Sequence, residues 1–181
     1  MNYLEIFFWL CILVILFSFV WASRSAAPWL PTRKKDVESL VRTLSPHVSH
    51  GAKICDIGCG NGTIVFSLVR FRDDVYATGV EISLLPLFFA YIRWYCSPLR
   101  IRKRVKIICN DLFKVSLHEF DVVVIFLLPK AYDRIRKKLK EELNPDAQAV
   151  FEAWPLPNAT PELTWKHPGG VSFFVYRIKN I

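Results

Sequence analysis

The sequence has little that could form a metal site or a disulfide framework. Its 181 residues include five cysteines, an odd number without a CxxC pair, and only four histidines. None of these histidines stands at a ligand spacing from a cysteine or from another metal-binding residue. Closely spaced cysteines and histidines mark zinc sites, and disulfide-linked small domains carry an even number of cysteines. We therefore expect no metal and no disulfide framework.

Charged residues are also sparse, at 22% of the chain, whereas 52% of the residues are hydrophobic and the mean hydropathy is +0.26. This composition excludes a disordered or collagen-like chain. A length of 181 residues leaves room for one globular domain and little else. So high an apolar content in so short a chain indicates a membrane segment.

Residues 6–22 contain no charged side chain. As a helix they span about 26 Å, close to the ~30 Å of a hydrocarbon core, and Arg24 can extend the segment by snorkelling. A cleaved signal peptide is the alternative, but Glu5 is the only charged residue before the segment, so the basic n-region is missing. Basic residues follow instead, which places the rest of the chain on the cytoplasmic or mitochondrial matrix side. We predict a single-pass membrane anchor with its linker over residues 1–27 and one domain over residues 28–181.

Short apolar strands alternate with amphipathic helices along residues 28–181. Strands are predicted over residues 53–57, 76–80, 105–108, 121–126, 149–153 and 171–178, and helices over residues 36–44, 63–69, 84–95 and 131–143. This alternation is typical of a parallel sheet covered by helices. The predicted fold class is α/β, a Rossmann-like, doubly wound and mostly parallel sheet, preceded by the transmembrane helix.

The first predicted strand leads into a glycine-rich turn that opens a helix, with the sequence Asp56-Ile57-Gly58-Cys59-Gly60-Asn61-Gly62. Glycines at such a turn let the backbone approach a ligand and adopt positive φ angles. The third glycine of the dinucleotide fingerprint GxGxxG is replaced by Thr63, so the spacing argues against NAD or FAD.

Acidic side chains follow the next two strands. Glu81 ends the second strand, nineteen residues after Gly62, and Asp111 follows the third. Ligands of open α/β sheets bind outside the carboxyl ends of the strands, so Asp56, Glu81 and Asp111 are expected to border one pocket, where Glu81 can accept hydrogen bonds from both hydroxyls of a ribose. The simpler alternative is that Glu81 only stabilises the start of the next helix. The turn and the acids together, in this order, favour a ligand site.

These motifs resemble those of class I, seven-β-strand, S-adenosylmethionine-dependent methyltransferases. A narrower resemblance covers nearly the whole chain. It is to the small membrane-anchored protein-lysine methyltransferases that modify the c subunit of ATP synthase and the adenine nucleotide translocase, and to their prokaryotic relatives. Besides the N-terminal anchor and the glycine turn, the segments that carry it are Pro28-Trp29-Leu30-Pro31-Thr32, Asn110-Asp111-Leu112-Phe113-Lys114-Val115, Val124-Ile125-Phe126, Lys137-Lys138-Leu139 and Trp154-Pro155-Leu156-Pro157.

The resemblance implies S-adenosylmethionine as the cofactor and a role for each position. The loop from Gly58 to Gly62 would pass under its methionine part, and Asp56 would order this loop and the ammonium end. Glu81 would hold the ribose hydroxyls, and Asp111 would accept a hydrogen bond from the adenine amino group. The expected cofactor-binding residues are Asp56, Gly58, Cys59, Gly60, Asn61, Gly62, Glu81, Ile82, Asp111 and Leu112.

Three positions depart from the pattern of that family: Asn61 stands where an acidic residue is usual, and Thr63 and Ala153 stand where arginine is usual. The first two are compatible with cofactor binding, whereas Ala153 belongs to the acceptor side. The segment 126–129 lacks the Asn/Asp-Pro-Pro-aromatic motif of enzymes that methylate amide or adenine nitrogens, which argues against those acceptors. No catalytic base can be assigned; Glu152, at the end of the fifth strand, is the one carboxylate to test.

Basic residues dominate the predicted domain. The first 23 residues contain only Glu5 as a charged side chain, so the remainder carries 24 basic and 15 acidic residues, a formal charge of +9. Residues 82–110 contain no acidic residue and combine aromatic side chains with Arg93, Arg100, Arg102, Lys103, Arg104 and Lys106. Such a segment attracts anionic lipid, or follows a nucleic-acid backbone with bases stacked on its aromatic rings. The third alternative is an apolar helix packed on the sheet and followed by a solvated basic loop. Given the anchor, we rank lipid above nucleic acid.

The sequence therefore predicts a membrane-anchored, S-adenosylmethionine-dependent methyltransferase that acts on a lysine of a membrane or membrane-associated protein. Two alternatives remain, because a fold does not determine a substrate. One is a methyltransferase for a lipid-like small molecule or RNA. The other is a tethered cofactor-binding module without transfer activity.

Overall fold

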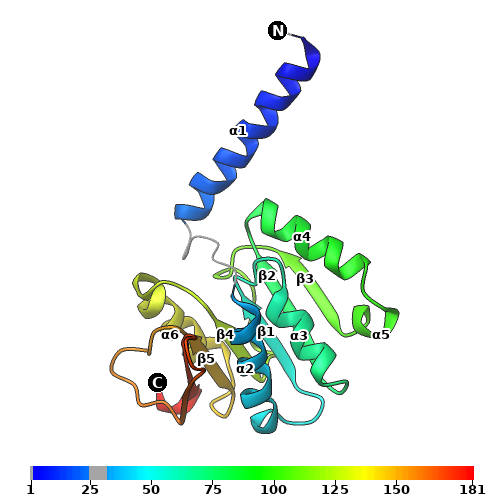
Figure 1. Cartoon of the computed structure of the whole chain (residues 1–181). Coiled ribbons are helices and arrows are strands. Elements are labelled where there is room, and N and C mark those ends of the chain that lie inside the picture. The colour runs from blue at the N-terminus through cyan, green and yellow to red at the C-terminus, as the bar shows by residue number, and fades with distance from the viewer. Residues whose placement is uncertain (1, 25–31) are drawn as a thin grey trace.

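The structure is a computed structural model that describes residues 2–24 and 32–181. Helix α1 (Tyr3–Arg24) extends away from the domain that the second range forms (Figure 1). Among the described residues, no helix combines the length and the apolar character that crossing a membrane requires, so the expected transmembrane helix is not confirmed. The linker motif at residues 28–31 lies outside the described residues.

Seven strands of residues 32–181 form one sheet in the order β3-β2-β1-β4-β5-β7-β6. In chain order they are β1 (Lys53–Ile57), β2 (Tyr76–Glu81), β3 (Val105–Cys109), β4 (Val122–Ile125), β5 (Gln148–Glu152), β6 (Leu163–Lys166) and β7 (Ser172–Arg177). The strands β1 to β5 pair in parallel, and β7 runs antiparallel to both of its neighbours. The strand order reverses between β1 and β4, which makes this point the expected place for a ligand.

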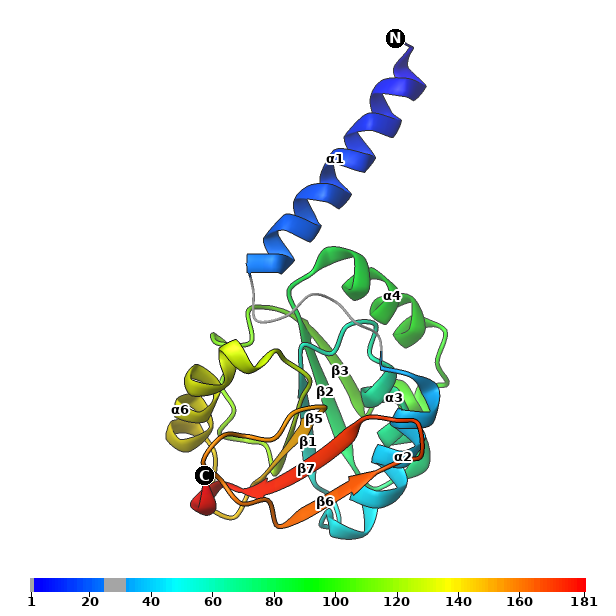
Figure 2. The same ribbon diagram turned by 60° about the vertical axis from the view of Figure 1, so that its left-hand side comes forward.

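Helices cover both faces of the sheet (Figures 1 and 2). Helices α2 (Lys34–Leu44) and α3 (Thr63–Phe71) pack on the face that carries Ile54 and Val124, whereas α6 (Tyr132–Glu142) packs on the face of Ile57 and Ile125. Helix α5 (Leu99–Arg102) contributes the buried Ile101 to a third cluster beside β2 and β3. The Rossmann-like, mostly parallel architecture predicted from the sequence is thereby confirmed.

The predicted elements recur with small differences at their ends, and one α-helix and one strand of residues 32–181 were not predicted. These are the short helix α5 and the edge strand β6. Helix α4 (Leu84–Tyr95) follows β2 directly and has the predicted range. It lies beside the start of α3, where a Cβ atom on Gly62 would be 3.7 Å from Ala90.

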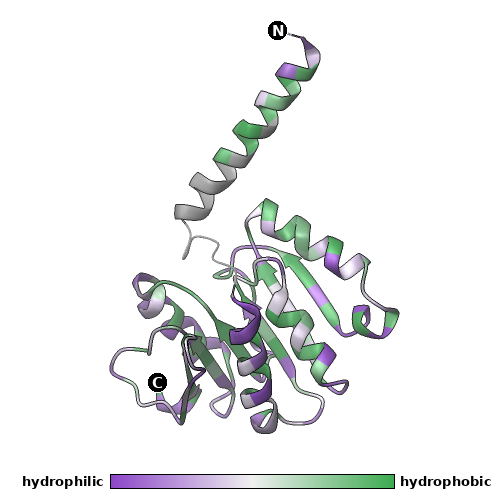
Figure 3. Ribbon diagram, in the orientation of Figure 1, coloured by the Kyte–Doolittle hydropathy of each residue, from purple (hydrophilic) through white to green (hydrophobic). Residues whose placement is uncertain are grey.

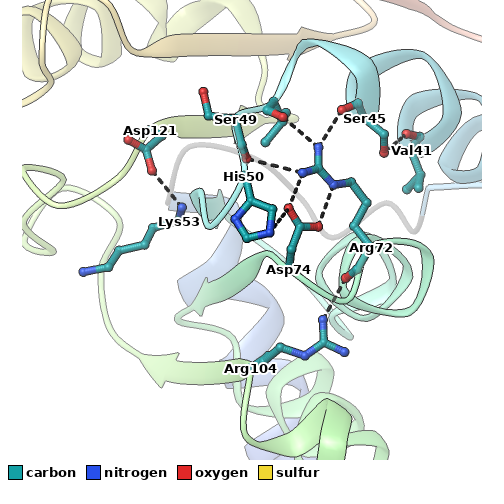
Figure 4. Close-up of polar contacts among 10 residues, drawn as sticks. Val41, Ser45, Ser49, His50, Lys53, Arg72, Asp74, Arg104 and Asp121 are labelled. Atoms are coloured by element: carbon teal, nitrogen blue, oxygen red, sulfur yellow. Dashed lines mark hydrogen bonds and ion pairs between the residues drawn. The ribbon is translucent and has the colours of Figure 1, made fainter.

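A network of polar contacts ties the elements together at the amino ends of the strands (Figure 4). The Arg72 guanidinium donates hydrogen bonds to the main-chain oxygens of Ser45 and Val48, both at 2.7 Å, and forms an ion pair with Asp74. The hydrogen bond from Arg72 holds the pKa of Asp74 below its usual range. Because these groups satisfy one another, this edge of the sheet serves to hold the fold together.

Candidate active site

The turn between β1 and α3 folds against the end of β2. The amide of Gly58 donates to the main-chain oxygen of Val80 at 2.8 Å, and the amide of Gly60 donates to the Glu81 carboxylate at 2.9 Å. Gly58 has a φ angle of 85°, and the nearest atom to a Cβ built there is Leu127 Cδ2, at 3.6 Å. The residue is exposed. The backbone is therefore open to the close approach of a ligand at Gly58, as the sequence predicts.

Two other residues of the turn serve its packing. Gly62 is the N-cap of α3 and has a φ angle of 75°; its amide donates to the Cys59 oxygen at 2.9 Å, and a Cβ atom there would lie 3.0 Å from the Phe66 ring. The Cys59 side chain is buried, and a Cβ atom on Gly79 would lie 2.6 Å from its Sγ. Burial raises the pKa of the Cys59 thiol. Both residues thus face the core, and their predicted contact with the cofactor is confined to backbone atoms.

Asn61 and Thr63, two of the departures from the family pattern, are hydrogen-bonded to each other. Thr63 Oγ1 donates to Asn61 Oδ1 at 2.6 Å and accepts a hydrogen bond from Arg93 Nη1 at 3.0 Å. Burial, with a smaller effect from the charge of Arg70, lowers the pKa of Arg93. In this chain α4 therefore brings a guanidinium beside the position where the family usually has an arginine.

Glu81 accepts three hydrogen bonds from main-chain amides. Its Oε2 accepts from Gly60 at 2.9 Å, and its Oε1 accepts from Ile82 at 2.9 Å and from Ser83 at 2.7 Å. An ionised carboxylate offers about four acceptor positions, so roughly one remains, on Oε2. Glu81 thus joins the glycine turn to the start of α4. Its predicted hydrogen bonds to the ribose hydroxyls stay a prediction.

Asp111 lies at the same edge, after β3. Its Oδ1 accepts a hydrogen bond from the amide of Phe113 at 2.9 Å, and no described residue bonds its Oδ2. The amide of the preceding Asn110 donates to the main-chain oxygen of Glu81 at 3.2 Å, which ties this turn to β2. Leu112 packs against the core on the α6 side of the sheet. An oxygen of Asp111 is therefore available for the predicted adenine amino group.

Asp56 is a buried carboxylate that accepts no hydrogen bond from any described residue. Burial, together with the nearby charge of Glu81, raises the pKa of Asp56 to about 7. A buried acid without a partner is unfavourable in its ionised form unless a cation reaches it. This arrangement suits a ligand that brings positive charge to the carboxyl end of β1.

Glu152 lies on the same face of the sheet as Asp56. Asp56 pairs with Val124, which pairs with Val150, and Glu152 is two residues beyond Val150 on β5. Thr32 Oγ1 donates to Glu152 Oε2 at 3.3 Å, which brings the start of the domain to this edge. Burial and the charge of Asp56 raise the pKa of Glu152 to about 8, against the opposing effect of the Thr32 hydrogen bond. A raised pKa near neutral pH is a property of acids that accept and donate protons in catalysis.

An aromatic pair stands at the ends of β4 and β5. The rings of Phe126 and Trp154 are stacked, with their centroids 6.4 Å apart and their planes at 20°. Tyr132 Oη donates to the main-chain oxygen of Trp154 at 3.1 Å. Between Glu152 and Trp154, Ala153 has a φ angle of 75°, a left-handed conformation that costs an alanine roughly 1 to 2 kcal/mol. Such strain is concentrated at functional sites. Both aromatic residues belong to segments that the sequence singles out, but their stacking was not predicted.

No group of three or more His, Cys, Asp or Glu side chains within residues 2–24 and 32–181 is arranged to hold a metal ion.

The fold and the site define the class of the protein as a class I methyltransferase. The RNA methyltransferase from Salinibacter ruber, solved with S-adenosyl-L-homocysteine, superposes with a TM-score of 0.73 and 25% sequence identity over 82% of this chain and 94% of its own. The model of the ANTKMT methyltransferase domain matches residues 56–163, more than half of the sequence. The chain belongs to this family of methyltransferases.

Two curated relatives illustrate the similarity. The lysine N-methyltransferase of Mus musculus that is named for the c subunit of ATP synthase is 31% identical over 137 residues, which are 76% of this chain and 53% of that protein. A protein-lysine N-methyltransferase of Saccharolobus islandicus is 27% identical over 150 residues, 82% of this chain and 91% of that protein. The chain thus spans about half the length of the mammalian relatives that it matches.

The cofactor of the family is S-adenosylmethionine, and the residues at the carboxyl edge of the sheet fit it. Its methionine part carries an ammonium and a sulfonium, and the unpartnered Asp56 carboxylate is suited to such positive charge. Glu81 keeps one acceptor position for the ribose, and Asp111 keeps one oxygen for the adenine amino group. The exposed Gly58 backbone allows the cofactor to approach. The individual contacts stay predictions.

Proposed function

We propose that this chain transfers methyl groups from S-adenosylmethionine to a lysine side chain of a membrane or membrane-associated protein. We further propose that α1 attaches it to the membrane, with the domain on the cytoplasmic or mitochondrial matrix side. The observation that carries the proposal is the placement of Asp56 and Glu152, two carboxyl groups that are buried on the same face of the sheet without a basic partner among the described residues, an arrangement that suits cationic groups. The names of the relatives, lysine methyltransferases from an animal and an archaeon, support the choice of acceptor.

The acceptor amine has to arrive without its proton, because an ammonium has no lone pair with which to attack. When bound, the cofactor supplies the electrophilic methyl group. A poorly solvated site lowers the pKa of the incoming lysine. In this proposal the ionised form of Glu152, whose pKa burial raises to about 8, takes up the proton that the acceptor amine loses. It is therefore the candidate catalytic base.

The stacked rings of Phe126 and Trp154 suit the rest of the lysine side chain. Trp154 is two residues beyond Glu152, and Phe126 follows β4, the strand between β1 and β5. Aromatic faces attract both the aliphatic stem of a lysine and the cationic methylated product. We therefore place the acceptor channel along this pair, with its inner end at Glu152.

Membrane attachment through α1 is supported by the apolar side chains on its surface. Ten of its described large apolar side chains, Tyr3, Leu4, Ile6, Phe7, Phe8, Trp9, Leu10, Leu13, Val14 and Leu16, are between 40% and 92% exposed. So many exposed apolar groups on one helix call for an apolar partner. In this proposal the partner is the lipid bilayer, where tethering raises the effective concentration of a membrane-bound acceptor.

The acceptor is tested by incubating the full chain in membranes with tritiated S-adenosylmethionine and separating protein, lipid and RNA. The proposal expects label in protein, recovered after hydrolysis as methylated lysine. Loss of a general base lowers turnover by about 10²- to 10⁴-fold, so Glu152→Gln should fall within this range. The exposed Glu119→Gln is the matched control and should remain active.

Other outcomes would replace the proposal. Label confined to lipid or RNA would identify a different acceptor. Cofactor binding without transfer to any fraction would identify a binding module.

The topology is tested separately by protease treatment of intact spheroplasts or mitoplasts. Digestion of the domain from the outside would contradict the proposed location.

A further inference from the structure

Helix α4 leaves most of its apolar side chains in solvent. Only Pro86, Leu87 and Ala90 of its 12 residues are buried. Six of its large apolar side chains, Leu84, Phe88, Phe89, Tyr91, Ile92 and Tyr95, are between 43% and 74% exposed. The sequence also allowed an apolar helix packed on the sheet and followed by a solvated basic loop. One side of α4 does pack on β2 and β3, and its other side remains exposed. An apolar patch of this kind on a folded domain marks an interaction surface.

Positive charge without a counter-ion borders the patch. Residues 82–110 contain six basic residues and no acidic one, and none of the six forms an ion pair in the described part of the chain. Arg100, Lys103 and Lys106 are exposed. The Arg102 guanidinium lies over the Trp94 ring, 4.3 Å from its centroid. The surface therefore combines exposed rings and alkyl groups with unneutralised cations.

The position of α4 relates this surface to α1. Residues of α1 and α4 are in contact, and both helices lie on the side of the domain to which the parallel strands point (Figures 1 and 2). Figure 3 shows hydrophobic residues along α4 and along the described part of α1. Helices α1 and α4 are thus neighbours.

We propose that α4 and α5 form a second membrane contact, which lies flat on an anionic bilayer. The apolar side chains of α4 enter the interfacial region, and the basic residues reach the lipid head groups. The exposed aliphatic Leu84, Ile92 and Leu99 favour lipid over nucleic acid, because bases stack on rings and not on alkyl side chains. The proposal rests on the membrane attachment proposed above and is independent of methyl transfer.

The contact has a consequence for the acceptor. Helix α4 starts three residues after Glu81, at the edge of the sheet that carries the candidate active site. A domain held by α4 and α5 therefore presents this edge close to the bilayer surface. Lysines that emerge near the head groups are then within its reach, whereas lysines in distant soluble segments are not.

The test measures how close α4 comes to lipid in the full chain. Cys96 is exposed at the end of α4, whereas Cys55 and Cys59 are buried. In a variant with Cys11→Ser and Cys109→Ser, a fluorophore on Cys96 reports its distance from spin-labelled lipids in vesicles of phosphatidylcholine with phosphatidylserine. The proposal expects strong quenching at Cys96. It expects little quenching of the same fluorophore on Lys137→Cys, an exposed position of α6, in a chain that also carries Cys96→Ser.

Paired variants separate the two parts of the surface. Phe88→Ser with Phe89→Ser should abolish quenching at Cys96, whereas Phe71→Ser, which alters an equally exposed phenylalanine of α3, should leave it unchanged. Arg100→Glu with Lys103→Glu should reduce quenching at low salt, and less at high salt because screening weakens the attraction. Lys130→Glu with Lys140→Glu, two exposed positions near and on α6, is the control.

Three results would overturn the proposal. In the first, the chain binds to the vesicles but the fluorophore on Cys96 is not quenched. This result would mean that α1 contacts the membrane and that α4 does not. Quenching that is unaffected by both α4 variants would have the same meaning. Protection of the fluorophore by single-stranded RNA, or by self-association seen in sedimentation, without quenching by lipid would assign the surface to that partner. None of these measurements depends on methyl transfer.

Discussion

Replacing Glu152 by glutamine should make the protein more stable at high pH while it lowers methyl transfer. The carboxylate is buried on the same face as Asp56, and its only described hydrogen bond is the one from Thr32 Oγ1, at 3.3 Å. Burial is the main cause that raises its pKa from the ordinary 4.5 to about 8. A glutamine of nearly the same shape removes the charge and keeps an oxygen for Thr32. The variant therefore tests whether burying the ionised Glu152 carboxylate lowers the free energy of unfolding of the native protein.

The magnitude follows from the pKa. A rise from 4.5 to about 8 corresponds to roughly 5 kcal/mol at 1.36 kcal/mol for each pH unit. Local relaxation and water entry reduce this penalty, so we expect about 2 kcal/mol in a measurement. The folded protein binds the proton more tightly than the unfolded chain does. Its stability relative to the variant is therefore greatest below about pH 4.5 and is lost as the pH rises through about 8.

The assay is thermal unfolding of the full chain in detergent, followed by circular dichroism across this pH range. For a domain of this size, about 2 kcal/mol corresponds to a melting temperature higher by about 4 to 8 °C. Glu152→Gln should match the parent at the acidic end and exceed it by this amount at the alkaline end. Glu119→Gln is the control of opposite sign, because the hydrogen bond from Lys53 lowers the pKa of Glu119. It should give no stabilisation at any pH.

Equal melting temperatures of Glu152→Gln and the parent at all pH values would refute the reasoning, as would a parent that is more stable above about pH 8. A variant that is stabilised but fully active would support the estimated cost of burying the Glu152 carboxylate. It would contradict the role of Glu152 as a catalytic base. A stabilised variant with slow transfer is the expected result, because functional acids in buried sites commonly reduce stability.

Three further predictions concern the cofactor and the membrane. Glu81→Ala should weaken S-adenosylmethionine binding in calorimetry by about 1 to 3 kcal/mol, because it removes the ribose acceptor and releases three amides; unchanged affinity would reject the assignment. Cofactor affinity should rise as the pH passes through about 7, where Asp56 ionises, and Asp56→Asn should remove this dependence; a dependence that persists would point to another group. Leu10→Lys with Leu13→Lys should release the chain from membranes in flotation assays, because each central lysine costs about 2.5 to 3.5 kcal/mol in a bilayer; a chain that still floats would argue against attachment through α1.

Local patterns predicted most of the parallel sheet. Residues 53–57 were predicted as a strand with the bounds of β1, because this run leads directly into the glycine-rich turn at Gly58. Residues 84–95 were predicted as a helix with the bounds of α4. Strand β6 was missed because it is four residues long, lies at the sheet edge and alternates half-buried with exposed positions. Such a strand carries little apolar signal of its own.

The acceptor side of the site depends on information that the local sequence does not contain. Asp56 and Glu152 share a face only because β4 lies between β1 and β5 in a particular register. The stacking of Phe126 on Trp154 depends on the same strand order. On the cofactor side, the glycine turn and the acid at the end of the next strand are close in sequence, so the local pattern indicates both; their contacts with the cofactor stay predictions. Even there, the hydrogen bonds that Glu81 accepts from three main-chain amides could be identified only in the folded structure.

The distribution of charge assigns two kinds of partner to two parts of the domain. The outer surface of α4 and α5 is cationic and apolar, with Arg100 and Lys103 exposed and no acid in residues 82–110. The carboxyl edge of the sheet holds Asp56 and Glu152 without a basic partner among the described residues. A cationic cofactor and a lysine are favoured at the acidic edge, and an anionic surface is favoured on α4 and α5. Because α4 begins beside Glu81, the two regions adjoin. In this arrangement the proposed membrane contact and the proposed methyl-transfer site would act on the same acceptor.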